Sequence, residues 1–157
     1  MHTLLEYKCA SPSDAEECIA LRGLTHQNPI SALQLAQLGI TVESLRESIQ
    51  SNEQLGLLCF SKKRLIGYCF GDRKTGEIVV LALLPEFENK GIGKNLLHLV
   101  VKDLHKSGHI TLFLSCSARP ESRSYGFYRH LGWYTTNRYD SNGDEILQYH
   151  LPPSSDA

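Results

Sequence analysis

The spacing of apolar residues along the chain changes from an irregular helical pattern to a pattern of short strands. Ser11-Pro12-Ser13-Asp14 is typical of a helix start, where proline is accepted at the first helical position. From residue 55 onward, short apolar runs separated by polar turns predict strands, and Asn142-Gly143 is a strong hairpin signal. The predicted order is strand, helices, three strands, helix, strand, helix and two strands. This order is typical of a mixed α/β domain.

The predicted strands cover residues 3–9, 55–60, 65–72, 77–84, 111–116 and 133–139, and a last strand runs through the alternating Leu147, Tyr149 and Leu151. The predicted helices cover residues 12–25, a short piece between 28 and 39, 41–48, 90–107 and 122–131. Pro85 ends the strand before the longest helix, since proline cannot donate to a central ladder.

Composition narrows the class of protein. The chain has 157 residues, 41% hydrophobic and 21% charged, which fits one globular domain and excludes intrinsic disorder as its main description. We therefore expect one domain over residues 1–157, with 152–157 as a flexible tail. A net charge of -1 and a pI of about 6.6 provide no basic surface for phosphate backbones, so no nucleic-acid partner is expected.

The chain shows no signal for export or for membrane insertion. Its longest apolar runs are far shorter than the roughly 18 residues that a membrane span needs, and its N-terminus lacks the features of a secretory signal. We expect a cytoplasmic protein without a membrane partner. Five cysteines without a C-x-x-C pair favour reduced packing residues over a disulfide or zinc framework, and no metal site is expected.

Residues 83–94 carry the strongest chemical signal. They place a strand end, a tight loop with Gly91 and Gly93, and a helix start in succession. The first turn of a helix offers unpaired N–H groups and a partial positive charge, to which Lys90 and Lys94 add formal charges. This arrangement predicts a cradle for a pyrophosphate. A plain sharp turn is the alternative, while the dinucleotide-binding G-x-G-x-x-G pattern fails because position 96 is leucine.

A second motif, Tyr125-Gly126-Phe127-Tyr128-Arg129-His130-Leu131-Gly132-Trp133, lies downstream. Together with Leu81-Ala82-Leu83-Leu84-Pro85 and Gly91-Ile92-Gly93-Lys94, it resembles the GCN5-related N-acetyltransferases, the GNAT superfamily, from about residue 55 to residue 151. The glycine segment is similar to that family's coenzyme A motif, Q/R-x-x-G-x-G/A, and the aromatic segment to its F-Y-x-x-x-G-F segment. Two motifs in the right order and separation are more specific than either motif alone.

The resemblance implies a central mixed, largely antiparallel sheet of about seven strands flanked by helices. It also implies acetyl-CoA as co-substrate in the splay between the fourth and fifth strands, with pantetheine amides paired to backbone there and no metal. The cofactor-binding residues carried over from the motif are Leu81, Ala82, Leu83, Asn89, Lys90, Gly91, Ile92, Gly93 and Lys94.

The chain departs from the family pattern at three positions. Glu88 stands where the family prefers glutamine or arginine, and a carboxylate beside a pyrophosphate costs affinity unless it turns to solvent. Glu121 stands where many members have an asparagine that contacts coenzyme A, and Ser115 lies where some members carry an acidic residue. The general base therefore stays open between Glu77, Glu121 and water.

Tyr128 is the predicted catalytic residue. When an amine attacks a thioester, a thiolate leaves, and a neutral phenol within hydrogen-bond reach stabilises it and can protonate the sulfur. The alternative is that Tyr125, Phe127 and Tyr128 form an ordinary aromatic patch of a packed helix. Gly126 inside this helix costs about 1 kcal/mol relative to alanine, which predicts close packing against a cofactor or a neighbouring strand.

The residues and the resemblance together predict an N-acetyltransferase that passes the acetyl group of acetyl-CoA to a primary amine by direct attack. The acceptor, a small molecule or a peptide or protein amine, leaves no signature, although residues 24–52 fall where such proteins build acceptor pockets. Members of the family are often dimers, so a homodimer stays open. The alternatives are a non-catalytic acyl-CoA-binding or interaction module with this fold, and an acyltransferase for a longer acyl group or an alcohol.

Overall fold

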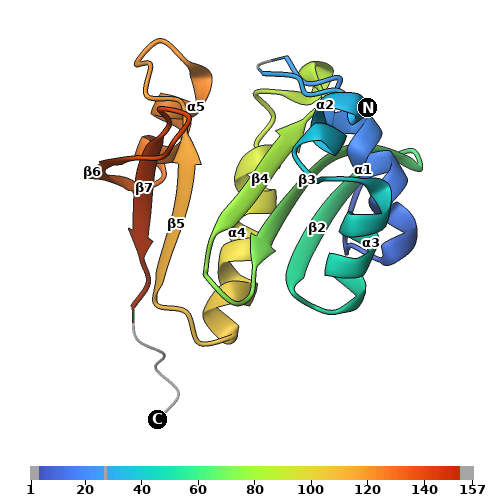
Figure 1. Ribbon diagram of the computed structural model, residues 1–157, viewed down its shortest axis with the longest axis horizontal. Coiled ribbons are helices and arrows are strands. Elements are labelled where there is room, and N and C mark those ends of the chain that lie inside the picture. Colours follow the sequence, from blue (N-terminus) through green and yellow to red (C-terminus); the bar gives the residue numbers. More distant parts are fainter. Residues whose placement is uncertain (1–3, 27, 153–157) are drawn as a thin grey trace.

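The computed structural model describes residues 4–26 and 28–152 (Figure 1). The strands are β1 (Leu5–Cys9), β2 (Gln54–Ser61), β3 (Arg64–Asp72), β4 (Ile78–Leu83), β5 (Thr111–Cys116), β6 (Tyr134–Tyr139) and β7 (Glu145–His150). The helices are α1 (Ala15–Arg22), α2 (Ala32–Gln37), α3 (Val42–Gln50), α4 (Ile92–Lys106) and α5 (Arg123–His130), with 3₁₀ turns η1 (Pro12–Asp14) and η2 (Pro85–Phe87). The predicted element types and their order are confirmed.

The ends of the elements differ from the prediction at the N-terminal side. The predicted first helix is divided into the 3₁₀ turn η1 and α1, and α1 ends at Arg22 because Gly23 caps it. Residue 3 of the predicted first strand and residues 153–157 of the predicted tail lie outside the described residues.

The seven strands form two antiparallel sheets, in the orders β1-β2-β3-β4 and β5-β7-β6. The sheets meet at a parallel bridge between Glu77 and Phe113, where the Phe113 N–H donates to the Gly76 carbonyl oxygen at 3.2 Å. Beyond this bridge β4 and β5 diverge, as Figure 1 shows. The predicted sheet of about seven strands is therefore splayed into two parts.

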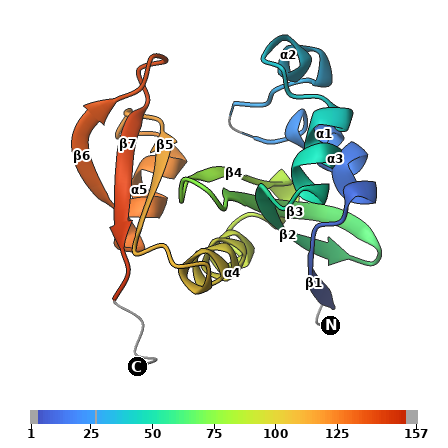
Figure 2. The same ribbon diagram turned by 60° about the horizontal axis from the view of Figure 1, so that its bottom comes forward.

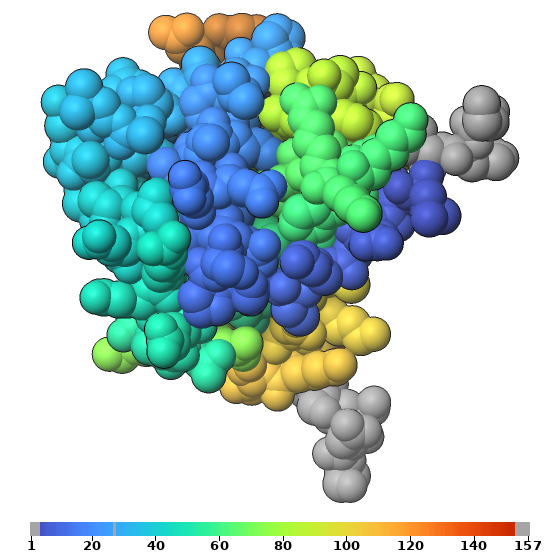
Figure 3. Space-filling model, turned by 90° about the vertical axis from the view of Figure 1, so that its right-hand side faces the viewer, coloured from blue at the N-terminus to red at the C-terminus, as the bar shows by residue number. Residues whose placement is uncertain are grey.

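Helices cover both faces of the four-stranded sheet (Figure 2). α1 and α3 pack on one face and α4 on the other. Figure 3 views the molecule from the side of the first three helices, which are coloured blue to cyan and cover this flank. The buried residues of α4 share the face toward the sheet and are Ile92, Leu96, Leu97, Val100, Val101 and Leu104.

One hydrophobic cluster runs through both sheets. It includes Leu58 and Ile66 of the four-stranded sheet, Leu97 of α4, and Leu112 and Leu147 of the three-stranded sheet, all at most 1% exposed. The two sheets therefore share one core although their strands diverge.

The five cysteines are free thiols: the buried ones are Cys18, Cys59, Cys69 and Cys116, and the exposed one is Cys9.

Two glycines lie in opposite surroundings. Gly56 lies directly across from Phe70 in the β2–β3 pairing, and a Cβ there would stand 2.3 Å from the Phe70 ring, which is 1% exposed. Only glycine lets this ring lie over the strand. At Gly126, by contrast, a Cβ would meet nothing within 4 Å, so the predicted close packing against a neighbouring strand is wrong.

Gly56→Ala should lower the midpoint of thermal unfolding by several degrees, because the buried Phe70 ring cannot move aside and overpacking costs about 1–3 kcal/mol. Gly126→Ala should leave the midpoint unchanged or raise the stability by up to about 1 kcal/mol, since alanine favours a helix over glycine. Circular dichroism during heating measures both. Equal midpoints for Gly56→Ala and the parent protein would contradict the close approach.

Candidate active site

The space between the diverging strands is a cleft of about 810 Å³. Its walls come from β4, β5, the loop before α4, the start of α5 and the segment that joins α1 to α2. Because β4 and β5 diverge from the Glu77–Phe113 bridge toward α4 (Figure 1), we call the end of the cleft at the bridge its narrow end and the end at the N-terminus of α4 its wide end. The cleft therefore connects a helix N-terminus to the point where the two sheets meet.

Both long walls of the cleft are strand edges. Within the described residues, β4 pairs along its length with β3 alone and β5 with β7 alone, so their facing edges have no strand partner beyond the bridge. Unpaired backbone N–H and C=O groups of this kind bind an extended ligand that carries amides. The walls are suited to such a ligand.

A β-bulge interrupts β4 inside the cleft. The pairing with β3 passes from Phe70–Val80 to Gly71–Ile78, which leaves Val79 as an extra residue. Val79 is 42% exposed and lines the cleft. A bulge disrupts the ladder locally and changes the direction of the strand, which helps β4 to turn away from β5.

The N-terminus of α4 faces the wide end. Gly91 has a φ of 80°, a left-handed conformation that glycine adopts without strain, and it caps α4 without a side chain. The Asn95 N–H donates to the Gly91 carbonyl oxygen at 3.1 Å. The N–H groups of the three preceding residues, 92–94, therefore have no partner within the helix. A Cβ on Gly93 would stand 3.7 Å from Phe127 and 3.9 Å from Leu81, both of which line the cleft. These are ordinary van der Waals distances, so packing does not require glycine here, and glycine leaves additional room beside the free N–H groups, which are suited to bind an anion.

All predicted cofactor-binding residues but one line the cleft, and these are Leu81, Ala82, Leu83, Asn89, Gly91, Ile92, Gly93 and Lys94. Lys90 is the exception. Its ammonium lies 5.7 Å from the centroid of the Phe87 ring, beside the 3₁₀ turn. The structure therefore brings Lys94 to the cleft and leaves Lys90 outside its lining.

Glu88 does not turn to solvent. Its side chain is 16% exposed and lines the cleft, where its Oε2 lies 3.2 Å from Nη1 of Arg123 and 3.7 Å from Nδ1 of His26. Arg123 also donates from Nη2 to Oδ1 of Asn89 at 2.9 Å. Arg123 was not among the residues predicted for the site. The sequence could have pointed to Arg123, because a cation at the first residue of a helix is unfavourable next to the positive end of the helix dipole.

Tyr128 is 9% exposed and lines the cleft. The rings of Phe127 and Trp133 meet it edge-on, with centroid separations of 5.0 and 6.1 Å. In the part of the chain that the structure describes, no group hydrogen-bonds its hydroxyl. Burial raises the pKa of Tyr128, and the thiols of Cys69 and Cys116 raise it further, so the phenol keeps its proton at neutral pH. The aromatic patch thus holds a neutral phenol in the cleft wall.

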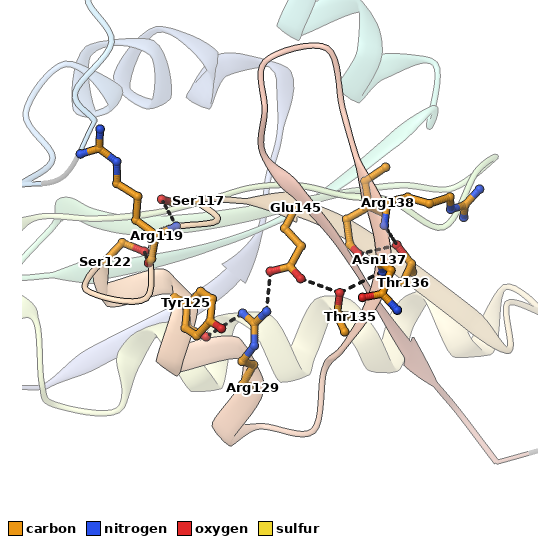
Figure 4. A network of polar contacts seen from close by, with 11 residues as sticks. Ser117, Arg119, Ser122, Tyr125, Arg129, Thr135, Thr136, Asn137, Arg138 and Glu145 are labelled. Carbon is orange, nitrogen blue, oxygen red and sulfur yellow. Dashed lines mark hydrogen bonds and ion pairs between the residues drawn. The ribbon is translucent and has the colours of Figure 1, made fainter.

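A charged network fastens α5 to the three-stranded sheet (Figure 4). Arg129 of α5 pairs with Glu145 of β7, which is 6% exposed and also accepts a hydrogen bond from Thr135 of β6. The guanidinium carbon lies 3.5 Å from the centroid of the Tyr125 ring. Hydrogen bonds from Thr135 and Arg129 hold the pKa of Glu145 below its ordinary value. The network fixes the helix next to Tyr128 and was not predicted from the sequence.

Of the two carboxylates considered as bases, only Glu77 lies next to the cleft lining. It is half-buried and directly precedes β4, and burial together with Asp72 and Asp140 raises its pKa. Glu121 is exposed in the loop before α5 and does not line the cleft. Asp144, a further carboxylate, lines the cleft, and burial and Asp140 raise its pKa.

Within residues 4–26 and 28–152, no three His, Cys, Asp or Glu side chains gather in a way that could hold a metal ion. The helices in those ranges are all too short or too polar to cross a membrane.

A splayed pair of strands that opens onto a helix N-terminus defines a class of α/β protein suited to bind a long anionic ligand through backbone groups. Residues 27–149 match the family model described as the acetyltransferase (GNAT) domain. The chain belongs to this family, and it is an acyltransferase of the GNAT type. No curated protein is significantly similar to it.

Solved structures of acetyltransferases share the fold. PaiA N-acetyltransferase from Thermoplasma acidophilum, in complex with coenzyme A, is 25% identical over 94% of this chain and 99% of that chain, with a TM-score of 0.69. The ribosomal-protein-S18-alanine N-acetyltransferase from Escherichia coli is 16% identical over 98% and 97%, with a TM-score of 0.70. Aminoglycoside 6'-acetyltransferase type Ii is 17% identical over 95% and 99%, with a TM-score of 0.73.

Proposed function

We propose that the protein transfers the acetyl group of acetyl-CoA to a primary amine, which attacks the thioester directly. The cleft between β4 and β5 carries this proposal, because it runs from the N-terminus of α4, along two unpaired strand edges, to the vicinity of Tyr128 and Glu77. Acetyl-CoA has a pyrophosphate, then amides, then a thioester. The features of the cleft follow one another in the same order.

The loop and first turn of α4 would bind the pyrophosphate. Backbone N–H groups from Gly91 to Lys94 supply hydrogen-bond donors, and the helix dipole and the Lys94 side chain supply positive charge. Leu81, Ala82 and Leu83 would pair their inner backbone edge with the pantetheine amides. These contacts use main-chain groups, so they depend on the shape of the chain more than on side-chain identity.

Tyr128 would stabilise the departing sulfur. Attack by the amine nitrogen on the thioester carbon breaks the carbon–sulfur bond, and the sulfur leaves as a thiolate that needs a proton. The raised pKa of Tyr128 makes full transfer of its proton to the thiolate unfavourable unless the site lowers the pKa of the phenol or raises that of the thiol. A hydrogen bond from the Tyr128 hydroxyl already stabilises the thiolate without full transfer.

Glu77 would remove the proton of the acceptor. A primary amine with a pKa of about 10.4 is protonated at neutral pH and cannot attack until it loses a proton. The raised pKa of the Glu77 carboxyl makes it a stronger base than an ordinary glutamate, and its place at the narrow end puts it near the end of an extended ligand. The proton reaches it directly or through water.

The segment between α1 and α2 would border the acceptor. It contributes Thr25, His26 and Asn28 to the lining, and Arg22 holds it by donating to the Asn28 carbonyl oxygen at 2.8 Å. Asp144 lines the cleft as well and supplies negative charge for an ammonium. The similar proteins are named for an alanine of a ribosomal protein and for an aminoglycoside, so this fold serves both peptide and small-molecule amines.

Calorimetric titration with acetyl-CoA tests the co-substrate. The parent protein should bind with a Kd in the micromolar range, about -8 kcal/mol, and Gly93→Glu should weaken binding at least about thirtyfold because it puts bulk and negative charge into the cradle. Gly126→Glu adds the same side chain at an open helical position and should bind like the parent. Absence of binding by the parent would contradict the proposal.

Tyr128→Phe should lower kcat about 100-fold and leave the Kd for acetyl-CoA within about threefold, because it removes only the hydroxyl that stabilises the thiolate. Steady-state assays that follow release of the free thiol measure this with any amine that the parent accepts. An unchanged kcat would assign Tyr128 to packing alone.

Glu77→Gln should remove the acid limb of the kcat/KM profile. In the parent, the rate should fall as the pH drops through the pKa of Glu77, which lies above that of an ordinary glutamate, since the protonated carboxyl cannot accept a proton. Glu121→Gln serves as the matched control and should keep the parent profile. The reverse result would identify Glu121 as the base.

A further inference from the structure

Arg123 spans the wide end of the cleft. As the first residue of α5 it stands on the β5 side, and its guanidinium reaches the loop before α4 on the β4 side. Nη1 lies 3.2 Å from Oε2 of Glu88, and Nη2 donates to Oδ1 of Asn89 at 2.9 Å. The two walls that meet through backbone at the narrow end are thus joined by side chains at the wide end.

Arg123 stands where helix electrostatics disfavour a cation. The N-terminus of a helix carries a partial positive charge, and the first turn of α5 contains no acidic residue that would offset it. The carboxylate of Glu88, from another segment, supplies the missing negative charge. An arginine at such a position is suited to bind a second anion, because its planar guanidinium has N–H donors beyond those that contact Glu88 and Asn89, and these can bind a phosphate.

The partners of Arg123 belong to the cradle itself. Asn89 has a φ of 63°, which is uncommon for a residue other than glycine, and it lies two residues before the cap of α4. Glu88, Asn89 and Arg123 all line the cleft together with Gly91. A pyrophosphate at the N-terminus of α4 would therefore lie beside both the carboxylate of Glu88 and the guanidinium of Arg123.

We propose that Arg123 is a phosphate-binding residue of this cleft and that Glu88 competes with the pyrophosphate of coenzyme A for its guanidinium. The inference rests on the proposed function. Glu88 repels the incoming phosphate and holds the arginine that would bind it, so it lowers the affinity for the co-substrate. His26, 3.7 Å from the same Glu88 oxygen, is an alternative partner for Glu88 once Arg123 has turned to the phosphate.

A purely structural role of the Glu88–Arg123 pair, or a pure effect of net charge, would give different results from competition. If the contacts of Arg123 only hold the loop before α4 in place, loss of either Glu88 or Arg123 loosens the cradle and weakens binding. If only net charge matters, removal of any nearby carboxylate strengthens binding equally. Competition requires opposite effects of Glu88→Gln and Arg123→Gln, confined to ligands with a phosphate.

The structure offers a matched control pair. Glu86 and Arg64 form an exposed ion pair with an N–O distance of 3.7 Å, and neither residue lines the cleft. Glu86→Gln and Arg64→Gln repeat the charge changes of Glu88→Gln and Arg123→Gln outside the cleft. Calorimetry with coenzyme A and with pantetheine, which has no phosphate, compares all four variants with the parent, and thermal unfolding verifies that each is folded.

Competition predicts that Glu88→Gln binds coenzyme A about tenfold more tightly and Arg123→Gln about tenfold more weakly, each about 1.4 kcal/mol. Pantetheine binding should stay within about twofold in both, and the two control variants should bind coenzyme A within about twofold of the parent. Weaker or unchanged binding by Glu88→Gln overturns the inference, and so does an equal gain in Glu86→Gln. If such a result occurs and the parent protein binds coenzyme A, the proposed function stands and only this inference fails. If the parent protein does not bind coenzyme A, the proposed function and this inference both fail.

Discussion

The rest of the structure depends on how briefly β4 and β5 pair. They share one backbone bridge, at Glu77 and Phe113, and then diverge, so that two strand edges face each other without satisfying each other's hydrogen bonds. An unpaired strand edge inside a domain is costly unless another molecule or solvent forms hydrogen bonds with its backbone N–H and C=O groups. Here the edges line a cleft that is open at its wide end, and a ligand with its own amides can complete both of them.

Chain connectivity aligns the other parts of the site with this opening. β4 leads through η2 and the Gly91 cap directly into α4, so the N-terminus of α4 necessarily lies at the mouth that β4 leaves open. β5 leads in the same way into α5, which carries Tyr128 along the opposite wall. The core that α4 shares with both sheets, and the pairing of Arg129 with Glu145, hold the two walls apart at a defined spacing.

The charges of the cleft are balanced in pairs between segments far apart in the sequence. Glu88 looks unfavourable in a phosphate cradle when it is considered with its sequence neighbours alone, but its side chain meets Arg123, 35 positions later. Glu145 is buried because Arg129 and Thr135 satisfy it. Glu77 and Asp144 have acidic neighbours instead of cationic partners, and burial together with those neighbours raises the pKa of each carboxyl.

Local patterns in the sequence determined the order and type of the elements, the glycine-rich turn at Gly91 and the aromatic helix around Tyr128, because capping, periodicity and left-handed turns depend on residues a few positions apart. The family resemblance added the expected splay. Only the tertiary structure decided that Lys90 lies outside the cleft lining, that Gly126 faces open space, and that Arg123 joins Glu88 and Asn89. Such contacts join segments tens of residues apart, and their geometry follows from how the two sheets pack on the shared core, which no local spacing in the chain encodes.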